Sequence, residues 1–124
     1  GRGAMLEILD ETSEDLVAFR ITGKHIHDES HKIAGLMDAR IARYGHARCF
    51  IEIGDTTGVA LSSLKEGLEF DLQHGKQIER CAVVGDHAWE AWLVKLLGLF
   101  FSKADVRFFH SSDRAAALEW AQAK

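Results

Sequence analysis

The chain has 124 residues, 47% hydrophobic and 27% charged, an ordinary composition for one globular domain that buries a core without disulfides or metal. Its 15 basic and 19 acidic residues give a formal net charge of −4 without a basic run, which argues against a nucleic-acid partner and against simple electrostatic docking onto anionic lipid. No apolar run reaches the roughly 18 residues of a membrane span, and no signal peptide is visible, so we expect a cytoplasmic protein.

The first four residues and the two cysteines indicate the expected extent of the domain and the redox state of its compartment. Gly1–Ala4 resemble a remnant of an expression vector, so we expect a single domain over residues 5–124. Cys49 and Cys81 each lie in an apolar, strand-like run without a CxxC motif or an adjacent pair of metal ligands. We expect both to be reduced and buried, which fits a reducing compartment.

The first half of the chain predicts two strands, a helix and a third strand. Residues 5–9 and 16–21 alternate apolar and polar side chains, and the turn-forming ETSED between them predicts an antiparallel hairpin. Helical spacing over residues 33–44 predicts a helix with Gly45 as its C-cap glycine. CFIEI at 49–53 is typical of a strand, which we expect to end at the GDTTG segment in a tight turn made by Gly54 and Gly58.

The second half continues the alternation of strands and helices. The pattern predicts helices at 61–77 and 87–101, strands at 78–84 and 104–110, and a C-terminal helix with Ser111 or Ser112 as its N-cap. The order β-β-α-β-α-β-α-β-α therefore predicts an α/β fold. We expect a single mixed, mainly parallel five-stranded sheet with about four helices and right-handed crossovers.

Three stretches carry a resemblance to a known family. They are the GDTTG segment, the stretch AVVGDHAWEAWLVKL and the ending ADVRFFHSSDRAAALEWA. Together with the order of elements, they resemble the SpoIIAA-like proteins, a family grouped by fold with STAS domains (anti-sigma-factor antagonists) and CRAL-TRIO lipid-binding domains. The resemblance covers the chain from Met5 onward. It implies a fold more firmly than a function, because the family lacks an established biochemical activity.

The segment HAWEAWLVKLLGLFF at 87–101 has more apolar surface than one helix face requires. On a helical wheel, only His87, Ala91, Lys95 and Gly98 occupy the side opposite the apolar arc, and Val94 widens that arc. The C-terminal helix with Leu118 and Trp120, a second subunit, a hydrophobic ligand or a membrane surface could cover the excess. The residues expected to bind a lipid-like ligand or a membrane are Trp89, Trp92, Leu93, Leu96, Leu97, Phe100 and Phe101.

Two polar segments are weaker candidates. His25, His27 and His31 lie close together, and an i, i+4 histidine pair can bind zinc or nickel, but a solvated helix entrance is the simpler explanation and no metal site is expected. In phospho-switched STAS domains a serine in an Asp-Ser-Ser-Gly stretch accepts phosphate. The resemblance places Ser62 or Ser63 there, although leucines replace the aspartate and the glycine.

Another set of polar residues follows two predicted strands. Because carboxyl ends of parallel strands meet at one sheet edge, we expect the residues after them to form the polar edge of a pocket, namely Asp55, Thr56, Thr57, Asp86 and His87. An aspartate–histidine pair can act in general acid–base catalysis. No nucleophile elbow, GxGxxG or Walker loop accompanies it, and Asp86 is explained as a helix N-cap.

The leading hypothesis is a non-catalytic binding module without a cofactor. It would bind a hydrophobic or lipid-like molecule between the sheet and segment 87–101, and the same apolar segment could attach it as a peripheral protein to the inner face of the membrane. The alternative is a STAS-like protein–protein interaction domain that acts as a homodimer. An enzyme that uses Asp86 and His87 is the third reading.

Overall fold

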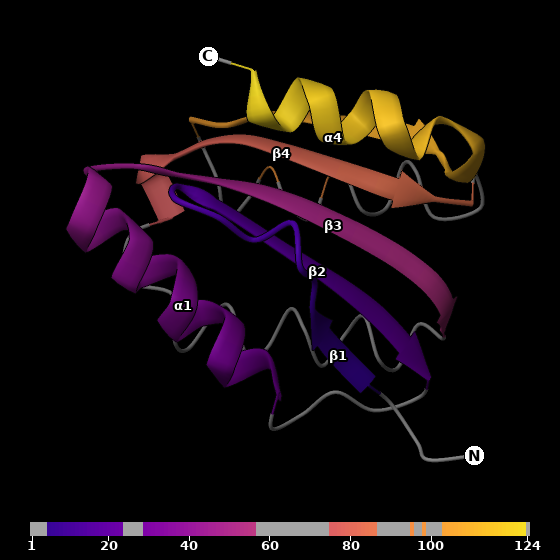
Figure 1. The fold of residues 1–124 in the computed structure, drawn as a ribbon, viewed down its shortest axis with the longest axis horizontal. Helices are drawn as coiled ribbons and strands as arrows, with labels where there is room; N and C mark the ends of the chain where they lie inside the picture. The colour runs from indigo at the N-terminus through magenta and orange to yellow at the C-terminus, as the bar shows by residue number, and fades with distance from the viewer. Residues whose placement is uncertain are drawn as a thin grey trace.

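The computed structural model describes residues 5–23, 29–56, 75–86, 95, 98 and 103–123. They form one five-stranded sheet in the order β1-β2-β3-β4-β5 with an α-helix on either side (Figure 1). The elements are β1 (Met5–Ile8), β2 (Leu16–Gly23), α1 (Glu29–Tyr44), β3 (Ala47–Thr56), η1 (Gly75–Gln77), β4 (Ile78–Gly85), β5 (Asp105–His110), η3 (Ser111–Asp113) and α4 (Arg114–Gln122). The sheet is mixed, because β1 pairs antiparallel with β2 whereas β2–β3, β3–β4 and β4–β5 are parallel pairs.

The helices differ in number from the sequence prediction. The described residues hold two α-helices, α1 and α4, where about four were expected. The predicted helices at 61–77 and 87–101 fall largely outside the described residues. Gly75–Gln77 form a short 3-10 helix rather than the last turn of an α-helix, and Lys95 and Gly98 are helical.

The predicted N-terminal hairpin is confirmed. Met5 pairs with Thr22 and Ile8 with Phe19 in an antiparallel ladder. Thr12 closes the connection, since its hydroxyl donates to the carbonyl of Ala18 at 2.9 Å and accepts from the amide of Ala18 at 2.9 Å. The side chain of Thr12 thereby supplies the acceptor for the Ala18 amide, while the Ala18 carbonyl also accepts from the amide of Leu9 at 2.8 Å.

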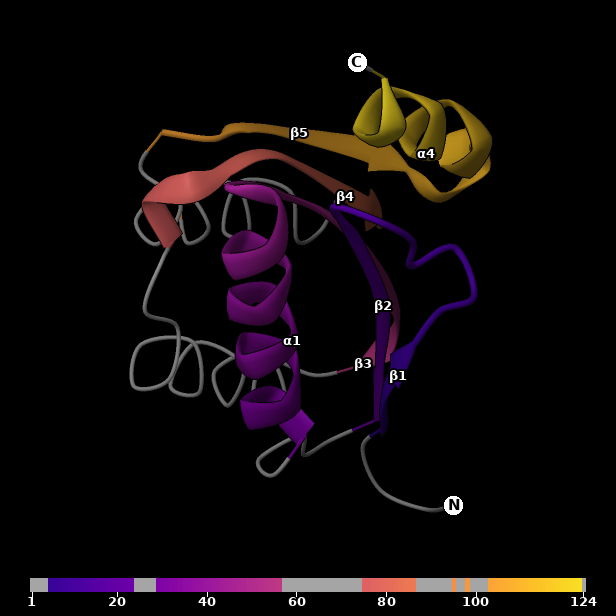
Figure 2. The same cartoon turned by 60° about the vertical axis from the view of Figure 1, so that its left-hand side comes forward.

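The core forms two layers, one on each face of the sheet. Figure 2 shows the two helices, α1 and α4, on opposite faces of that sheet. Alternate residues of the central strands point to opposite faces, as the period of two requires. On one face, α1 packs Ile33, Met37 and Ile41 against residues that include Phe19 and Ile51. On the other face, α4 contributes Ala117 and Ala121, which pack with Leu9, Leu16, Ala18, Phe50, Ala82 and Val84. The buried residues on both faces of β4 match the prediction of a strand covered on both sides.

The predicted end of α1 is confirmed, and the predicted turn at Gly54 is wrong. Gly45 has φ +82°, and its amide donates to the carbonyl of Ile41 at 2.8 Å, as a C-cap glycine does. Gly54 lies within β3, which continues to Thr56. The glycine fits there because a β-carbon would lie 2.8 Å from Cγ2 of Thr22 on the adjacent strand.

The predicted N-cap of the C-terminal helix is also wrong. Ser111 and Ser112 lie inside η3, whose cap is His110, and the His110 side chain accepts from the amide of Ser112. The following helix α4 has Asp113 at its N-cap position without a side-chain cap bond. The 3-10 turn between strand and helix moves the N-cap of α4 by one or two residues, from the predicted serines to Asp113.

None of the helices within the described residues combines the length and the apolar character that crossing a bilayer requires.

Candidate functional site

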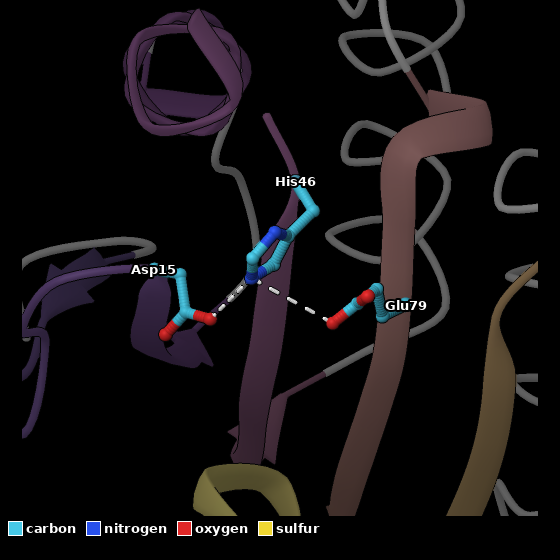
Figure 3. Close-up of side chains that lie close together, drawn as sticks. All are labelled: Asp15, His46 and Glu79. Carbon is cyan, nitrogen blue, oxygen red and sulfur yellow. Dashed lines mark hydrogen bonds and ion pairs between the residues drawn. The ribbon is translucent and has the colours of Figure 1, made fainter. Parts of the chain in front are cut away.

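A histidine and two carboxylates converge at the edge of the sheet where the parallel strands begin (Figure 3). Asp15 directly precedes β2, His46 directly precedes β3, and Glu79 is the second residue of β4. Nε2 of His46 lies 2.7 Å from Oδ2 of Asp15 and 3.7 Å from Oε1 of Glu79. One ligand atom from each residue lies within 4.8 Å of the others.

Backbone hydrogen bonds hold the three segments in place. The amide of Arg48 donates to the carbonyl of Asp15 at 2.8 Å, and an isolated bridge joins Ser13 to Leu16. The carbonyl of Gly45, next to His46, accepts from the side-chain amide of Gln77 at 3.2 Å. Glu79 is the second residue of β4 and lies at the irregularity between the Ala47–Ile78 and Arg48–Arg80 pairs. The positions of all three side chains are therefore set by secondary structure and its immediate borders.

Arg48 supplies the positive charge of this cluster. Its Nε lies 3.3 Å from Oε1 of Glu79 and 3.7 Å from Oδ2 of Asp15, and its side chain is only 12% exposed. Its NH1 donates to the carbonyls of Ala121 and Ala123 at the end of α4. Arg48 thus connects both carboxylates to the C-terminus of that helix, where a cation is favourable.

A hollow of about 300 Å³ opens beside the cluster. It is lined by Glu14, Asp15, Tyr44, His46, Arg48 and Glu79. Its lining contains carboxylates, an imidazole and a phenol but no serine or cysteine nucleophile. The arrangement suits the binding of a cation or a small polar molecule better than covalent catalysis.

Sequence reasoning missed this cluster. Asp15, His46 and Glu79 carry no common motif and are separated by about thirty residues each along the chain. The available signal was that Asp15 and Glu79 stand at the predicted beginnings of strands and that His46 lies three residues before the predicted strand at 49–53. Three parallel strands in consecutive order bring those beginnings to one edge.

The opposite edge of the sheet holds the residues that the sequence predicted as a polar pocket rim. Asp55 and Thr56 belong to the last part of β3, and Asp86 is exposed directly after the adjacent strand β4. Thr57 and His87 lie outside the described residues. The strand ends therefore share an edge, while the convergence of these side chains stays a prediction.

The remaining predicted site residues fall on parts of the chain that the structure does not describe. These are the lipid-binding set Trp89, Trp92, Leu93, Leu96, Leu97, Phe100 and Phe101, the serines Ser62 and Ser63, and the histidines His25 and His27. His31 lies in the first turn of α1, and its side chain is outside the description.

A second polar network lies on the face of the sheet that α4 covers. Nε of Arg114 donates to Glu52 at 2.9 Å, and its NH2 donates to Glu11 at 3.0 Å. The hydrogen bond from Arg114 lowers the pKa of the Glu11 carboxyl, and the hydrogen bond to Glu52 is the main cause that raises the pKa of Arg114. Arg20 also contacts Glu52, at 3.4 Å. These charges neutralise one another, and the network ties the start of α4 to the sheet.

Comparison with known proteins identifies the class. The SpoIIAA-like family model matches residues 16–122, so the chain belongs to the SpoIIAA-like family. A solved structure with a TM-score of 0.59 is an uncharacterized protein from the DUF3478 family of Shewanella loihica PV-4, described as having a SpoIIAA-like fold. The two proteins share 24% identity over 96% of this chain and 94% of the other. Among curated proteins, none matches. The family suggests an interaction or regulatory domain.

Proposed function

We propose that this protein is a non-catalytic binding module that accepts a hydrophobic or lipid-like molecule between its sheet and the segment 87–101. The observation that carries the proposal concerns Lys95 and Gly98, which are helical and exposed. Both belong to the narrow side of the helical wheel that lacks large apolar residues. Their exposure supports the predicted orientation, in which the wide apolar arc faces away from water.

The strand order supports a location for this segment. The strands β2, β3, β4 and β5 are parallel and follow one another in sequence across the sheet. Right-handed crossovers between them should all pass over the same face. The crossover from β2 to β3 contains α1, so the connection from β4 to β5 is expected on the α1 face as well.

If segment 87–101 lies on the α1 face, the C-terminal helix cannot cover its apolar arc. The C-terminal helix packs on the other face, where Ala117 and Ala121 are buried and Leu118 and Trp120 pack against the same cluster. The ring of Trp120 lies 5.9 Å from that of Phe109 on β5. A helix on the far side of the sheet is not available to cover a segment on the α1 face. A neighbouring helix on the α1 face, a ligand, a membrane surface or a second subunit remains as the cover.

We infer a population shift as the mechanism. Without ligand, segment 87–101 would lie against the sheet, and with lipid it would turn its apolar side outward, toward a bound lipid or the inner face of a membrane. Such a shift requires that lipid contacts favour the outward state by a few kcal/mol, about 5.5 kcal/mol for a complete reversal of populations. Lipid binding would agree with the resemblance, noted from the sequence, to a fold group that includes the CRAL-TRIO lipid-binding domains.

Tryptophan fluorescence tests the proposal, because the three tryptophans separate into two groups. In Trp120→Phe, emission comes only from Trp89 and Trp92, and it should shift when oleate or anionic phospholipid vesicles are added. The matched variant Trp89→Phe/Trp92→Phe retains only Trp120, which lies on the α4 face, and should not shift. If the emission spectrum of Trp120→Phe did not change at lipid concentrations far above micromolar, the lipid proposal would be wrong.

The apolar excess also motivates the alternative, a STAS-like homodimer whose interface uses this surface. Size-exclusion chromatography with light scattering separates the two. A stable dimer whose mass and Trp emission do not change when lipid is added supports the interaction domain. A monomer whose Trp emission shifts with lipid supports the ligand-binding module. An enzyme that uses Asp86 and His87 stays a third reading, tested by screening His87→Ala for loss of any activity found.

A further inference from the structure

We propose that Asp15, His46 and Glu79 bind one divalent transition-metal ion, with Zn²⁺ as the natural probe. This site is independent of the apolar segment and lies at the other edge of the sheet from the predicted pocket rim. The donor set of one imidazole nitrogen and two carboxylate oxygens is one that zinc accepts. Figure 3 shows the imidazole placed between the two carboxylates, with Nε2 directed at both.

The distances suit a shared metal. Ligand atoms bound to one zinc at about 2.0–2.2 Å are about 3.3–3.5 Å from each other in a tetrahedral arrangement. The Nε2–Oδ2 distance of 2.7 Å and the Nε2–Oε1 distance of 3.7 Å lie on either side of that separation. Small side-chain rotations of Asp15 and Glu79, with exposed fractions of 21% and 48%, can equalise them. The hollow of about 300 Å³ leaves room for water at the remaining coordination positions.

Arg48 can hold a carboxylate ligand in place without coordinating the metal itself. A carboxylate oxygen has two lone pairs, so Oε1 of Glu79 can accept from Arg48 and still coordinate a metal. Hydrogen-bonded carboxylates are usual around bound metals, because the outer partner fixes the orientation of the ligand. The charges of two carboxylates and one guanidinium leave one net negative charge for a divalent ion. The guanidinium also limits the affinity, since it repels the metal.

The backbone arrangement favours the bound geometry before the metal arrives. The three residues stand at the beginnings of three paired strands, and the Arg48 amide and the Gln77 side chain fix the segments on either side of His46. Ligands on rigid elements lose little conformational entropy on binding.

The test must separate this site from the other histidines. We would use His25→Gln/His27→Gln/His31→Gln as the background, because those residues are a competing candidate, and titrate Zn²⁺ by calorimetry. The expected result is saturable binding of one Zn²⁺ per chain that survives in this background. His46→Gln or Glu79→Gln should weaken it by at least about tenfold, while His110→Gln, at the other edge of the sheet, should leave it unchanged.

Two outcomes would overturn the proposal. One is the loss of saturable Zn²⁺ binding in the triple-glutamine background, which would assign binding to the N-terminal histidines. The other is equal affinity in the His46→Gln, Glu79→Gln and His110→Gln variants. Circular dichroism on each variant shows that it is folded, and Glu79 is exposed enough for its glutamine variant to keep the fold if the histidine variant does not.

Discussion

Cys49 on β3 and Cys81 on β4 lie directly opposite one another in the parallel ladder, and both side chains are fully buried. Sγ of Cys49 also lies 4.0 Å from Sδ of Met37 on α1. Both cysteines are free thiols, as the sequence predicted. Burial raises the pKa of the Cys81 thiol well above its ordinary value, and the neighbouring Cys49 adds to the rise. A buried, protonated thiol is a packing residue rather than a nucleophile.

The first prediction follows from this raised pKa. The folded Cys81 keeps its proton at pH values where the unfolded thiol has lost it, so stability is complete below the unfolded pKa and falls as the pH rises toward the folded one. The free energy of unfolding should fall by about 1.4 kcal/mol per pH unit above the ordinary thiol pKa. Cys81→Ala should remove this pH dependence. The substitution should also lower the free energy of unfolding by about 1–2 kcal/mol at neutral pH, because it leaves a small cavity in the core. Denaturant titrations from pH 7 to 10 measure both.

Alkylation provides the check on accessibility. Iodoacetamide should leave both thiols of the native protein unmodified at pH 8 and label both in guanidinium chloride, as mass spectrometry would show. Rapid labelling of Cys81 in the native protein would contradict its assignment to the core.

The second prediction concerns the ion pair between Glu11 and Arg114. The lowered pKa of Glu11 means that its stabilisation is present above the unfolded pKa and is lost as the pH falls through the folded pKa. Glu11→Gln should therefore cost less than about 1 kcal/mol at pH 7, because both side chains are about a third exposed, and the cost should shrink as the pH falls through the folded pKa. Denaturation at several pH values with and without 1 M salt measures this. Glu7→Gln, whose 3.3 Å pair with Arg20 is more exposed, is the control and should cost less.

These examples show how far the sequence goes. Alternation and helical spacing predicted the hairpin, α1 and all five strands, because burial of one face imposes those periods directly on the chain. The start of α4 was misplaced because a serine N-cap and a 3-10 turn capped by His110 use the same few residues. The cluster of Asp15, His46 and Glu79 was missed for a different reason. Its members meet only through strand order and register, which no local pattern records.

Gly54 illustrates the same limit and leads to the third prediction. Two residues of β3, Gly54 and Asp55, lie opposite Thr22, because Ile21 pairs with Ile53 and Gly23 with Thr56. A β-carbon at Gly54 would meet Cγ2 of Thr22 at 2.8 Å and the carbonyl of Ile21 at 3.4 Å. Gly54→Ala should therefore lower the free energy of unfolding by about 1–3 kcal/mol.

Two further variants make this prediction specific. Thr22→Ser removes Cγ2 and should recover part of the loss in a double mutant with Gly54→Ala. Gly35→Ala is the matched control, since Gly35 is exposed on α1 with nothing within 4 Å of its β-carbon position, and it should raise stability by about 1 kcal/mol. Equal effects of the two glycine substitutions in urea denaturation would contradict the close contact at Thr22.

The fourth prediction compares two arginines that contact the ring of Trp120 on α4. The guanidinium of Arg80 lies 5.4 Å from the ring centroid, and its NH1 also donates to the carbonyls of Trp120 at 2.8 Å and Ala123 at 3.0 Å. The guanidinium of Arg107 lies 4.9 Å from the ring, and its half-exposed side chain pairs with Asp105 at 3.3 Å. Arg80 therefore satisfies carbonyls at the helix end in addition to the cation–π contact.

Arg80→Met should consequently cost about 1.5–3 kcal/mol, because the Trp120 carbonyl loses its charged donor near the end of the helix dipole, whereas the Ala123 carbonyl keeps the hydrogen bond from Arg48. Arg107→Met should cost less than about 1 kcal/mol, the usual size of an exposed cation–π contact. Guanidinium denaturation followed by circular dichroism measures both, and the fluorescence of Trp120 in the Trp89→Phe/Trp92→Phe background reports which variant loosens α4. If Arg107→Met were the more damaging change, the stacking on Trp120 rather than the carbonyl bonds would hold the C-terminal helix on the sheet.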